Sequence, residues 1–228
     1  VAHLNGLGLE DYTIGIIATG ALLQYLYETQ KTSLFHLTRI TPYSTSKYMT
    51  LDSSTRRNLE LVETMREKQK RGSLLWVLDK TKTAMGARLL RTYLEQPLIN
   101  KKKIIHGLEA IEELNENVFI REEIREYLNP IYDLERLIGR ISYKTANPRD
   151  LISFQNSLLM IPPIKYQLSH LKSSLIKNIY DSLDPLEDIT SLIKEGIVDD
   201  PPILIREGGI IKEGFHKEVD NLRKAKTE

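Results

Sequence analysis

The chain has 228 residues and a formal net charge of +1; 41% of its residues are hydrophobic, 28% are charged and none is cysteine. This composition supplies enough apolar side chains for a packed core, and it excludes a wholly disordered chain, a disulfide framework and a thiolate metal site. The near-zero net charge excludes a dedicated polybasic nucleic-acid module, so any contact with DNA or RNA would come from a local patch.

The first predicted element is a helix over residues 14–26. Its apolar side chains form one stripe at helical spacing, and a second apolar set predicts burial on two sides. The uncharged stretch 12–27 is interrupted by threonine and glutamine and falls short of the about 20 apolar residues of a membrane span. No signal peptide is recognisable, so no membrane partner is expected. Because the chain begins at Val1, we expect a piece of a longer or processed protein.

The next segment, residues 32–50, differs in character from the helix before it. Residues 33–40 alternate as a strand would, and Thr41-Pro42 ends the alternation. The cluster Ser44-Thr45-Ser46 is typical of a loop. We therefore predict a boundary or linker that closes a first part of the chain at residue 46.

From residue 51 onward, helical apolar patterns follow one another. Three residues stand where N-caps are expected, each ahead of an apolar run: Ser73, Thr83 and Asn100. Pro97 is expected to stop the helix that Thr83 begins. After Asn100, the spacing predicts an inward face of Ile104, Leu108, Ile111 and Leu114, with Glu109, Glu112 and Glu113 outward.

The best local helix signal is Asn147-Pro148-Arg149-Asp150, where Asn at the N-cap, Pro at N1 and an acid at N3 agree. This helix is expected to extend to Ile161 and to end at Pro162-Pro163. A short later helix over residues 189–193 is expected to have Gly196 as its C′ residue.

One β unit is predicted among the helices. Two apolar runs flank Gly208-Gly209, a pair that supplies the positive φ of a tight turn, which indicates a hairpin near residues 203–214. A charged helix follows from Phe215. The predicted fold class is mainly α: a multi-helix bundle with one short β-hairpin.

No reaction chemistry is predicted. Residues 15–20 have the glycine spacing of a phosphate-binding loop, but Ala21 and Leu22 stand where such a loop needs Lys and Ser or Thr. The histidines lie too far apart in sequence for a helical metal pair, and the carboxylates are interspersed with Lys and Arg as on solvated helix faces. We therefore predict no catalytic, cofactor-binding or metal-binding residue.

Two basic clusters are candidates for a phosphate backbone: residues 66–71 and Lys101-Lys102-Lys103. The first contains Glu67, the second lies on the outer side of a helix start, and no aromatic residues interleave with either for base stacking. These features favour solvated surface, so no nucleic-acid residue is assigned.

Several stretches, taken in order, resemble the bacterial MutS family of DNA mismatch-recognition ATPases. They are residues 7–10, 19–26, 49–52, 55–61, 72–90, 133–137, 147–151 and 205–211. The resemblance covers nearly the whole chain. It implies that residues 1–46 end a connector domain and its linker, that 47–214 are the first part of a core or lever domain, and that 215–228 start a lever helix leading to a DNA clamp.

The resemblance also picks out a set of core-signature residues, to which it assigns a structural role. They are Arg56, Asn58, Glu60, Asp79, Gly86, Arg88, Arg136, Pro148, Arg149, Asp150, Gly208 and Gly209. The segment Arg56-Arg57-Asn58 is in addition a candidate hinge or junction, although helix capping and core-edge packing explain it as well.

What the resemblance implies about function lies mostly outside these residues. The Phe-x-Glu motif with which the family reads a mismatch is missing, because no Phe has Glu two positions on. The ATPase motifs, which take ATP and Mg, would lie beyond the C-terminus, so this piece is expected to be no enzyme. Expected partners are mismatched double-stranded DNA through absent domains, a second copy in a homodimer, and a repair protein such as MutL, in the cytoplasm.

In this interpretation the chain helps to link the DNA clamp to the ATPase. One alternative is a stand-alone helical protein-interaction scaffold unrelated to DNA repair. Another is a paralogue within the family that acts in recombination and does not read mismatches. Residues 20–26 resemble the mismatch-recognising type more than this paralogue. If the chain is a piece of a larger core, apolar helix faces should be left uncovered and should promote self-association.

Overall fold

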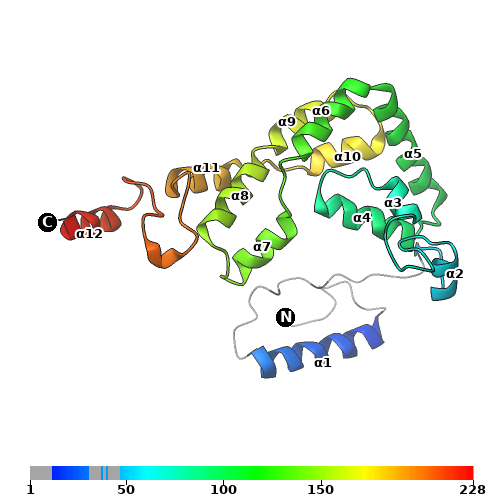
Figure 1. Ribbon diagram of the computed structural model, residues 1–228, viewed down its shortest axis with the longest axis horizontal. Helices are drawn as coiled ribbons and strands as arrows, with labels where there is room; N and C mark the ends of the chain where they lie inside the picture. Colours follow the sequence, from blue (N-terminus) through cyan, green and yellow to red (C-terminus); the bar gives the residue numbers. More distant parts are fainter. Residues whose placement is uncertain (1–11, 31–36, 38–39, 41–46, 228) are drawn as a thin grey trace. The chain divides into compact units, whose positions relative to one another are not determined.

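The computed structural model describes residues 12–30, 37, 40 and 47–227, and these are mostly helical (Figure 1). The predicted mainly α fold class is confirmed. The chain divides into two compact units, residues 1–47 and 48–228. Among the described residues, no helix is both long and apolar enough to cross a lipid bilayer.

The first unit contains helix α1 (Thr13–Gln30), which confirms the predicted helix and extends it by a turn. None of its residues is buried, so the expected burial on two sides is not found. An apolar helix is buried only where another element covers it, and composition alone cannot supply that element. The predicted strand over residues 33–40 lies outside the described residues except at Leu37 and Ile40.

The second unit consists of short helices in a row. Their bounds are α2 (Ser53–Asn58), α3 (Leu74–Leu78), α4 (Ala84–Glu95), α5 (Lys101–Glu116), α6 (Val118–Leu128), α7 (Leu134–Ser142), α8 (Pro148–Leu158), α9 (Ile161–Leu168), α10 (Ser174–Ser182), α11 (Glu187–Gly196) and α12 (Lys217–Thr227).

The predicted N-caps are all confirmed. The side-chain oxygens of Ser73, Thr83, Asn100 and Asn147 accept the amide N–H three residues later, at 2.8 to 3.2 Å. Each bond satisfies a donor that the helix itself leaves free. Pro97 also ends α4 as expected, since that helix stops at Glu95.

Two hydrophobic clusters hold most of this unit together. One joins α7, α8, the first residue of α9 and α11 through Leu137, Phe154, Leu158, Ile161, Ile193 and Ile197. The other joins α5, α9 and α10, with α6 packed against it, through Ala110, Ile164, Leu168, Leu171 and Ile176. Figure 1 shows these helices as two neighbouring groups connected through α8 and α9. Partly buried Leu183 packs against both clusters and makes them continuous.

The predicted inward face of α5 is confirmed only in part. Leu114 packs against the second cluster, and Glu109 and Glu112 are exposed as expected. Ile104, Leu108 and Ile111, however, are exposed, and the buried residue of this helix is Ala110. Glu113, expected outward, accepts the amide N–H of Ser173 at 2.8 Å and that of Lys172, at the N-terminus of α10. Glu113 thus faces the start of α10, about 60 residues away in the sequence. The spacing of apolar residues within α5 gives no information about that partner.

The predicted β-hairpin near residues 203–214 does not form. Residues Ile205–Glu207 make a short 3-10 helix, and Ile211 instead forms an antiparallel bridge with Ile197. The hydrogen bonds run from Val198 N–H to Ile210 O and from Lys212 N–H to Gly196 O, both 2.9 Å. The second apolar run therefore pairs with the chain that leaves α11, because that partner joins it to the core cluster.

Two further details differ from expectation. Gly196 is the last residue of α11 and has no left-handed backbone; a Cβ there would lie 3.0 Å from the ring of Phe215. The glycine is needed for close packing of that ring. The prolines Pro162 and Pro163 lie in the first turn of α9, where their missing N–H groups cost nothing, while α8 already ends at Leu158.

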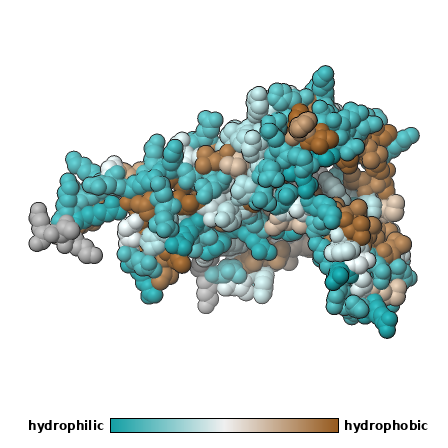
Figure 2. All heavy atoms as spheres, turned by 45° about the horizontal axis from the view of Figure 1, so that its top comes forward, coloured by the Kyte–Doolittle hydropathy of each residue, from teal (hydrophilic) through white to brown (hydrophobic). Residues whose placement is uncertain are grey.

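Several large apolar side chains remain exposed in the part of this unit that contains α2 to α5. They include Leu74, Trp76, Val77, Leu78, Leu89, Tyr93, Leu108 and Ile111. Figure 2 shows hydrophobic groups at the surface among hydrophilic ones. The expected uncovered helix faces are therefore present, and self-association through them stays a prediction.

Candidate functional site

The signature residues around α2 form a reversing turn. Arg56 Nε donates to the Leu51 carbonyl at 3.0 Å. Glu60 has a left-handed backbone with φ of +46°, and its carboxylate accepts the amide N–H of Met65 at 2.7 Å. The Glu60 carbonyl accepts the amide N–H of Leu74 at 3.0 Å, which brings the turn against the start of α3. Asn58 ends α2 and is exposed.

Asp79 fastens the turn between α3 and α4. Its carboxylate pairs with the ammonium of Lys70 and accepts hydrogen bonds from the amide N–H and the hydroxyl of Thr81, at 3.2 and 2.6 Å. The hydrogen bond from Lys70, together with those from Thr81, lowers the pKa of Asp79 to about 2. Lys70 belongs to the basic cluster at 66–71, so this lysine is engaged within the chain.

Gly86 lies in the first turn of α4, directly over its N-cap. The Gly86 amide N–H donates to Thr83 Oγ1 at 3.0 Å, and a Cβ on Gly86 would also lie 3.0 Å from that oxygen. The absence of a side chain therefore leaves room for the capping hydroxyl.

Arg88 makes a branched ion-pair network with two acidic residues that are distant in the sequence. Its guanidinium donates to both carboxylate oxygens of Asp133, at 2.6 and 2.9 Å, and also to Glu135. Asp133 is at the same time the N-cap of α7 and pairs with Arg136 Nε at 3.3 Å. The hydrogen bond from Arg88 lowers the pKa of Asp133 to about 2 and raises that of Arg88. This network joins α4 to α7 across more than 40 residues.

The low pKa of Asp133 predicts an acid-sensitive contribution to stability. Its ordinary pKa is 3.8, so the contribution should be complete above pH about 4 and be lost as the pH falls through about 2. We expect Asp133→Asn, whose amide oxygen can still cap α7, to flatten the fall of the urea midpoint between these pH values. Arg88→Gln should flatten it too, because Arg88 is the main cause. An acid limb as steep in both variants as in the wild type would contradict this assignment.

The predicted helix start at Asn147 is a complete capping box. The Asn147 amide N–H donates to Asp150 Oδ2 at 2.7 Å, the Asp150 amide N–H donates to Asn147 Oδ1 at 2.8 Å, and Pro148 occupies N1. Arg140, at the end of α7, donates to Asp150 Oδ1 at 2.7 Å. The single carboxylate of Asp150 thus caps α8 and ties it to α7.

Arg149 projects from the same turn toward the segment that follows α11. Its Nε donates to the carbonyl of buried Pro201 at 2.9 Å, and its guanidinium lies 3.5 Å from exposed Asp200. Gly208 and Gly209 lie in the loop beyond, with φ of +74° and +70° and open space around each. Glycine is favoured at these two positions by the positive φ of the backbone and not by crowding from a neighbouring group.

Sequence reasoning missed three residues that help to build these junctions. Arg140 and Glu113 act on partners that no local pattern announces. Ser157, which is fully buried, donates to the Ser153 carbonyl at 2.8 Å and accepts the Tyr132 amide N–H at 3.0 Å. A single serine inside a helix carries no sequence signal of this role.

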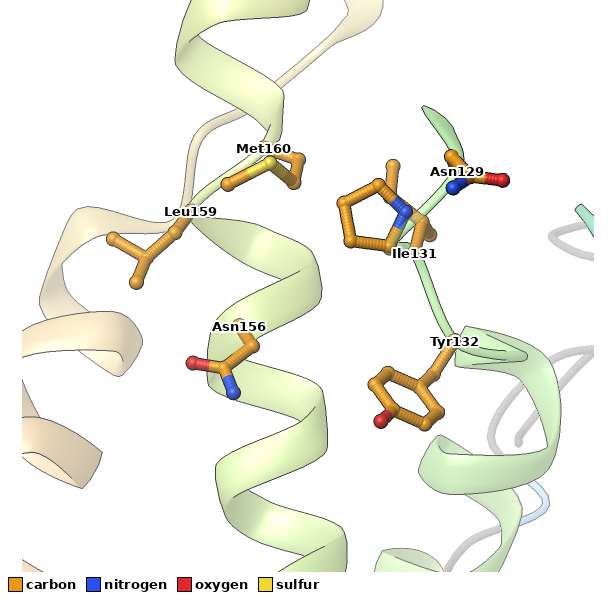
Figure 3. Close-up of a pocket in the computed structure, with 7 residues that line it drawn as sticks. Asn129, Ile131, Tyr132, Asn156, Leu159 and Met160 are labelled. Atoms are coloured by element: carbon orange, nitrogen blue, oxygen red, sulfur yellow. The ribbon is translucent and has the colours of Figure 1, made fainter. Parts of the chain in front are cut away.

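A shallow pocket of about 470 Å³ lies between the turn at residues 129–132 and α8 (Figure 3). Amide and apolar side chains and one tyrosine line it, and no signature residue contributes. Among the described residues, no three His, Asp or Glu side chains group as a metal ion would require. The junctions described above are arrangements that position helices.

A set of capped helices fastened to one another by ion pairs defines a helical structural domain. Residues 54–227 match the family model described as MutS domain III, which is more than half of the chain. The chain therefore belongs to the MutS family.

Curated relatives agree with this family. The chain is 67% identical, over its whole length, to the DNA mismatch repair protein MutS of Lachnoclostridium phytofermentans, of which it covers 24%. It is 52% identical over 96% of its length to that of Ruminiclostridium cellulolyticum, and 49% identical over 99% to that of Halothermothrix orenii, of each of which it covers 25%. The chain thus spans about a quarter of the length of these relatives.

Proposed function

We propose that these residues are a structural and transducing part of a DNA mismatch-recognition protein. The observation that carries the proposal is the match of residues 54–227 to MutS domain III, together with relatives named as DNA mismatch repair proteins. In this proposal the full-length protein binds mismatched double-stranded DNA and hydrolyses ATP with Mg through segments outside residues 1–228. The residues described above serve neither reaction directly and position the parts that do.

The geometry suits such a role. The two hydrophobic clusters make α5 to α11 one packed body, and Arg149 fastens that body to the segment leading into α12. In the proposal α12 begins the lever helix toward the DNA clamp, residues 47–214 form the first part of the core domain, and residues 1–46 end the connector. Packed helical elements of this kind carry coupling free energies of about 1–3 kcal/mol between distant sites.

The proposal extends to the surroundings of the protein. We infer a homodimer, a repair partner such as MutL and a cytoplasmic location. The stand-alone scaffold unrelated to DNA repair has no support from the comparisons, since every relative cited above is a mismatch repair protein.

The proposal predicts that Arg149→Met uncouples two activities of the full-length protein. Without its contacts to Pro201 and Asp200, α8 should pass less of the clamp's displacement to the ATPase. We expect the mismatch-dependent change in ATP turnover to shrink by about threefold to tenfold, while mismatch affinity and basal turnover stay within about twofold. Steady-state ATPase assays with matched and mismatched duplexes, and a binding titration, measure all three quantities.

Arg136→Met is the matched control, because Arg136 is 80% exposed and, among the described residues, its ion pair is with Asp133 at the start of its own helix, α7. It should leave the mismatch dependence unchanged. If Arg149→Met behaves like Arg136→Met, the proposed transducing role of this junction is wrong. If it abolishes DNA binding itself, the residues act in recognition, which also contradicts the proposal.

A further inference from the structure

Residues 48–99 form a section with its own contacts. Leu61 and Leu75 are buried, the amide N–H of Leu75 donates to the Leu61 carbonyl at 2.8 Å, and α3 packs on α4. Tyr48 bridges Leu98, so the two ends of the section lie together. We call residues 48–99 the N-terminal section.

Little apolar burial joins this section to the following helices. The two hydrophobic clusters, as far as the described residues define them, contain no member before Ala110. Helix α4 has an apolar side with Met85, Leu90 and Leu94, yet none of its residues is buried. These three side chains are partly buried, but within the described residues none packs against either cluster. A buried apolar stripe is what ordinarily joins such a helix to its neighbours, so the contact of α4 with the following helices is of another kind.

Charged side chains provide that contact. The Arg88 guanidinium donates two hydrogen bonds to Asp133 and one to Glu135. Arg125 in α6 also donates to the Lys80 carbonyl at 3.3 Å. The anchor on the far side is rigid, because Asp133 caps α7 and α7 belongs to the first hydrophobic cluster. A bidentate pair of this geometry fixes direction as well as distance.

We propose that Arg88, Asp133 and Glu135 form a latch that holds the N-terminal section against α7, and that the section swings about residues 96–100 when the latch opens. Water reaches two of the three latch residues: the side chains of Arg88 and Glu135 are 43% and 72% exposed, whereas that of Asp133 is 14% exposed. Ion pairs with exposed partners are weakened by salt, so a rise in salt concentration or a competing interaction favours the open latch. This inference concerns residues 48–135 and does not depend on the proposed function.

The test is a distance measurement across the latch. In the full-length protein, with any other cysteines replaced by serine, spin labels go on Y93C in α4 and I138C in α7, two exposed positions outside the latch. Pulsed electron spin resonance should give one narrow distance distribution for the wild-type latch. In R88Q we expect the distribution to broaden about twofold and to shift, as a hinge opening requires.

R91Q is the matched control, since Arg91 pairs with Glu95 inside α4 and, in the part of the chain that the structure describes, has no ion pair with another helix. It should leave the distribution unchanged. E135Q removes the most exposed partner without touching the cap of α7, so it should give a partial broadening even if R88Q folds poorly. Raising the salt from low concentration to about 0.5 M should broaden the wild-type distribution and leave that of R88Q unchanged. The latch is refuted if R88Q and the wild type give the same distribution, or if salt affects both equally.

Discussion

Replacing Leu158 by alanine is expected to lower the free energy of unfolding by about 3 kcal/mol. Leu158 is 3% exposed and lies in the cluster formed by α7, α8 and α11. The substitution removes three buried carbon atoms and leaves a cavity that capped, ion-paired helices cannot easily close. Urea denaturation followed by far-ultraviolet circular dichroism measures the change.

Leu159→Ala is the control, because it makes the same chemical change at the neighbouring residue. Leu159 is 45% exposed on the rim of the shallow pocket, so we expect a loss below about 1 kcal/mol. Equal losses for the two variants would mean that the cluster around Phe154 and Ile193 does not provide the main apolar stabilisation of this unit.

Helix starts were the part of the fold that the sequence could predict. The caps at Ser73, Thr83, Asn100 and Asn147 depend on a side chain and an amide three residues apart. Both partners of each hydrogen bond therefore lie within four consecutive residues, where a local sequence pattern reveals them. The stop at Pro97 is local in the same way, since a missing N–H and a ring clash need no distant partner.

Helix faces and strand partners were not predictable from the same information. Glu113 of α5 binds backbone amides at the start of α10, and Ile211 pairs with Ile197, the residue that follows the end of α11. Neither partner is close in the sequence. Gly196 illustrates the limit most directly. Its position at a helix end suits a C′ glycine, but its lack of a side chain serves the ring of Phe215, which only the folded chain brings there.

The signature residues show the same division. Pro148 and Asp150 were interpretable from local rules, and the structure has them in the expected capping box. The partners of Arg88 and Arg149 lie 45 or more residues away in the sequence. The family resemblance therefore identified these arginines as signature residues but did not indicate their hydrogen-bond partners. Their roles in the full-length protein stay predictions, which the experiments on the latch and on Arg149 address.

Replacing Asp150 by alanine is expected to cost about 2 kcal/mol of unfolding free energy, despite its polar surroundings. The carboxylate of Asp150 accepts hydrogen bonds from the amide N–H of Asn147 and from the guanidinium of Arg140, and Asp150 is buried. Its loss leaves a helix-start amide without an acceptor and a cation without its partner. Because half of the Arg140 side chain remains in water, the cost should stay below that of breaking a fully buried pair.

A double-mutant cycle separates the two parts of this effect. Arg140→Met alone removes the ion pair and keeps the cap, and we expect a coupling energy with Asp150→Ala of about 1 kcal/mol. Asp188→Ala serves as control, since Asp188 lies exposed in the first turn of α11 and should cost less than about 1 kcal/mol. A coupling energy near zero would mean that Asp150 acts only as a cap. The contact between α7 and α8 would then rest on the Leu137 and Phe154 cluster alone, and charge at this junction would contribute nothing to holding the two helices in register.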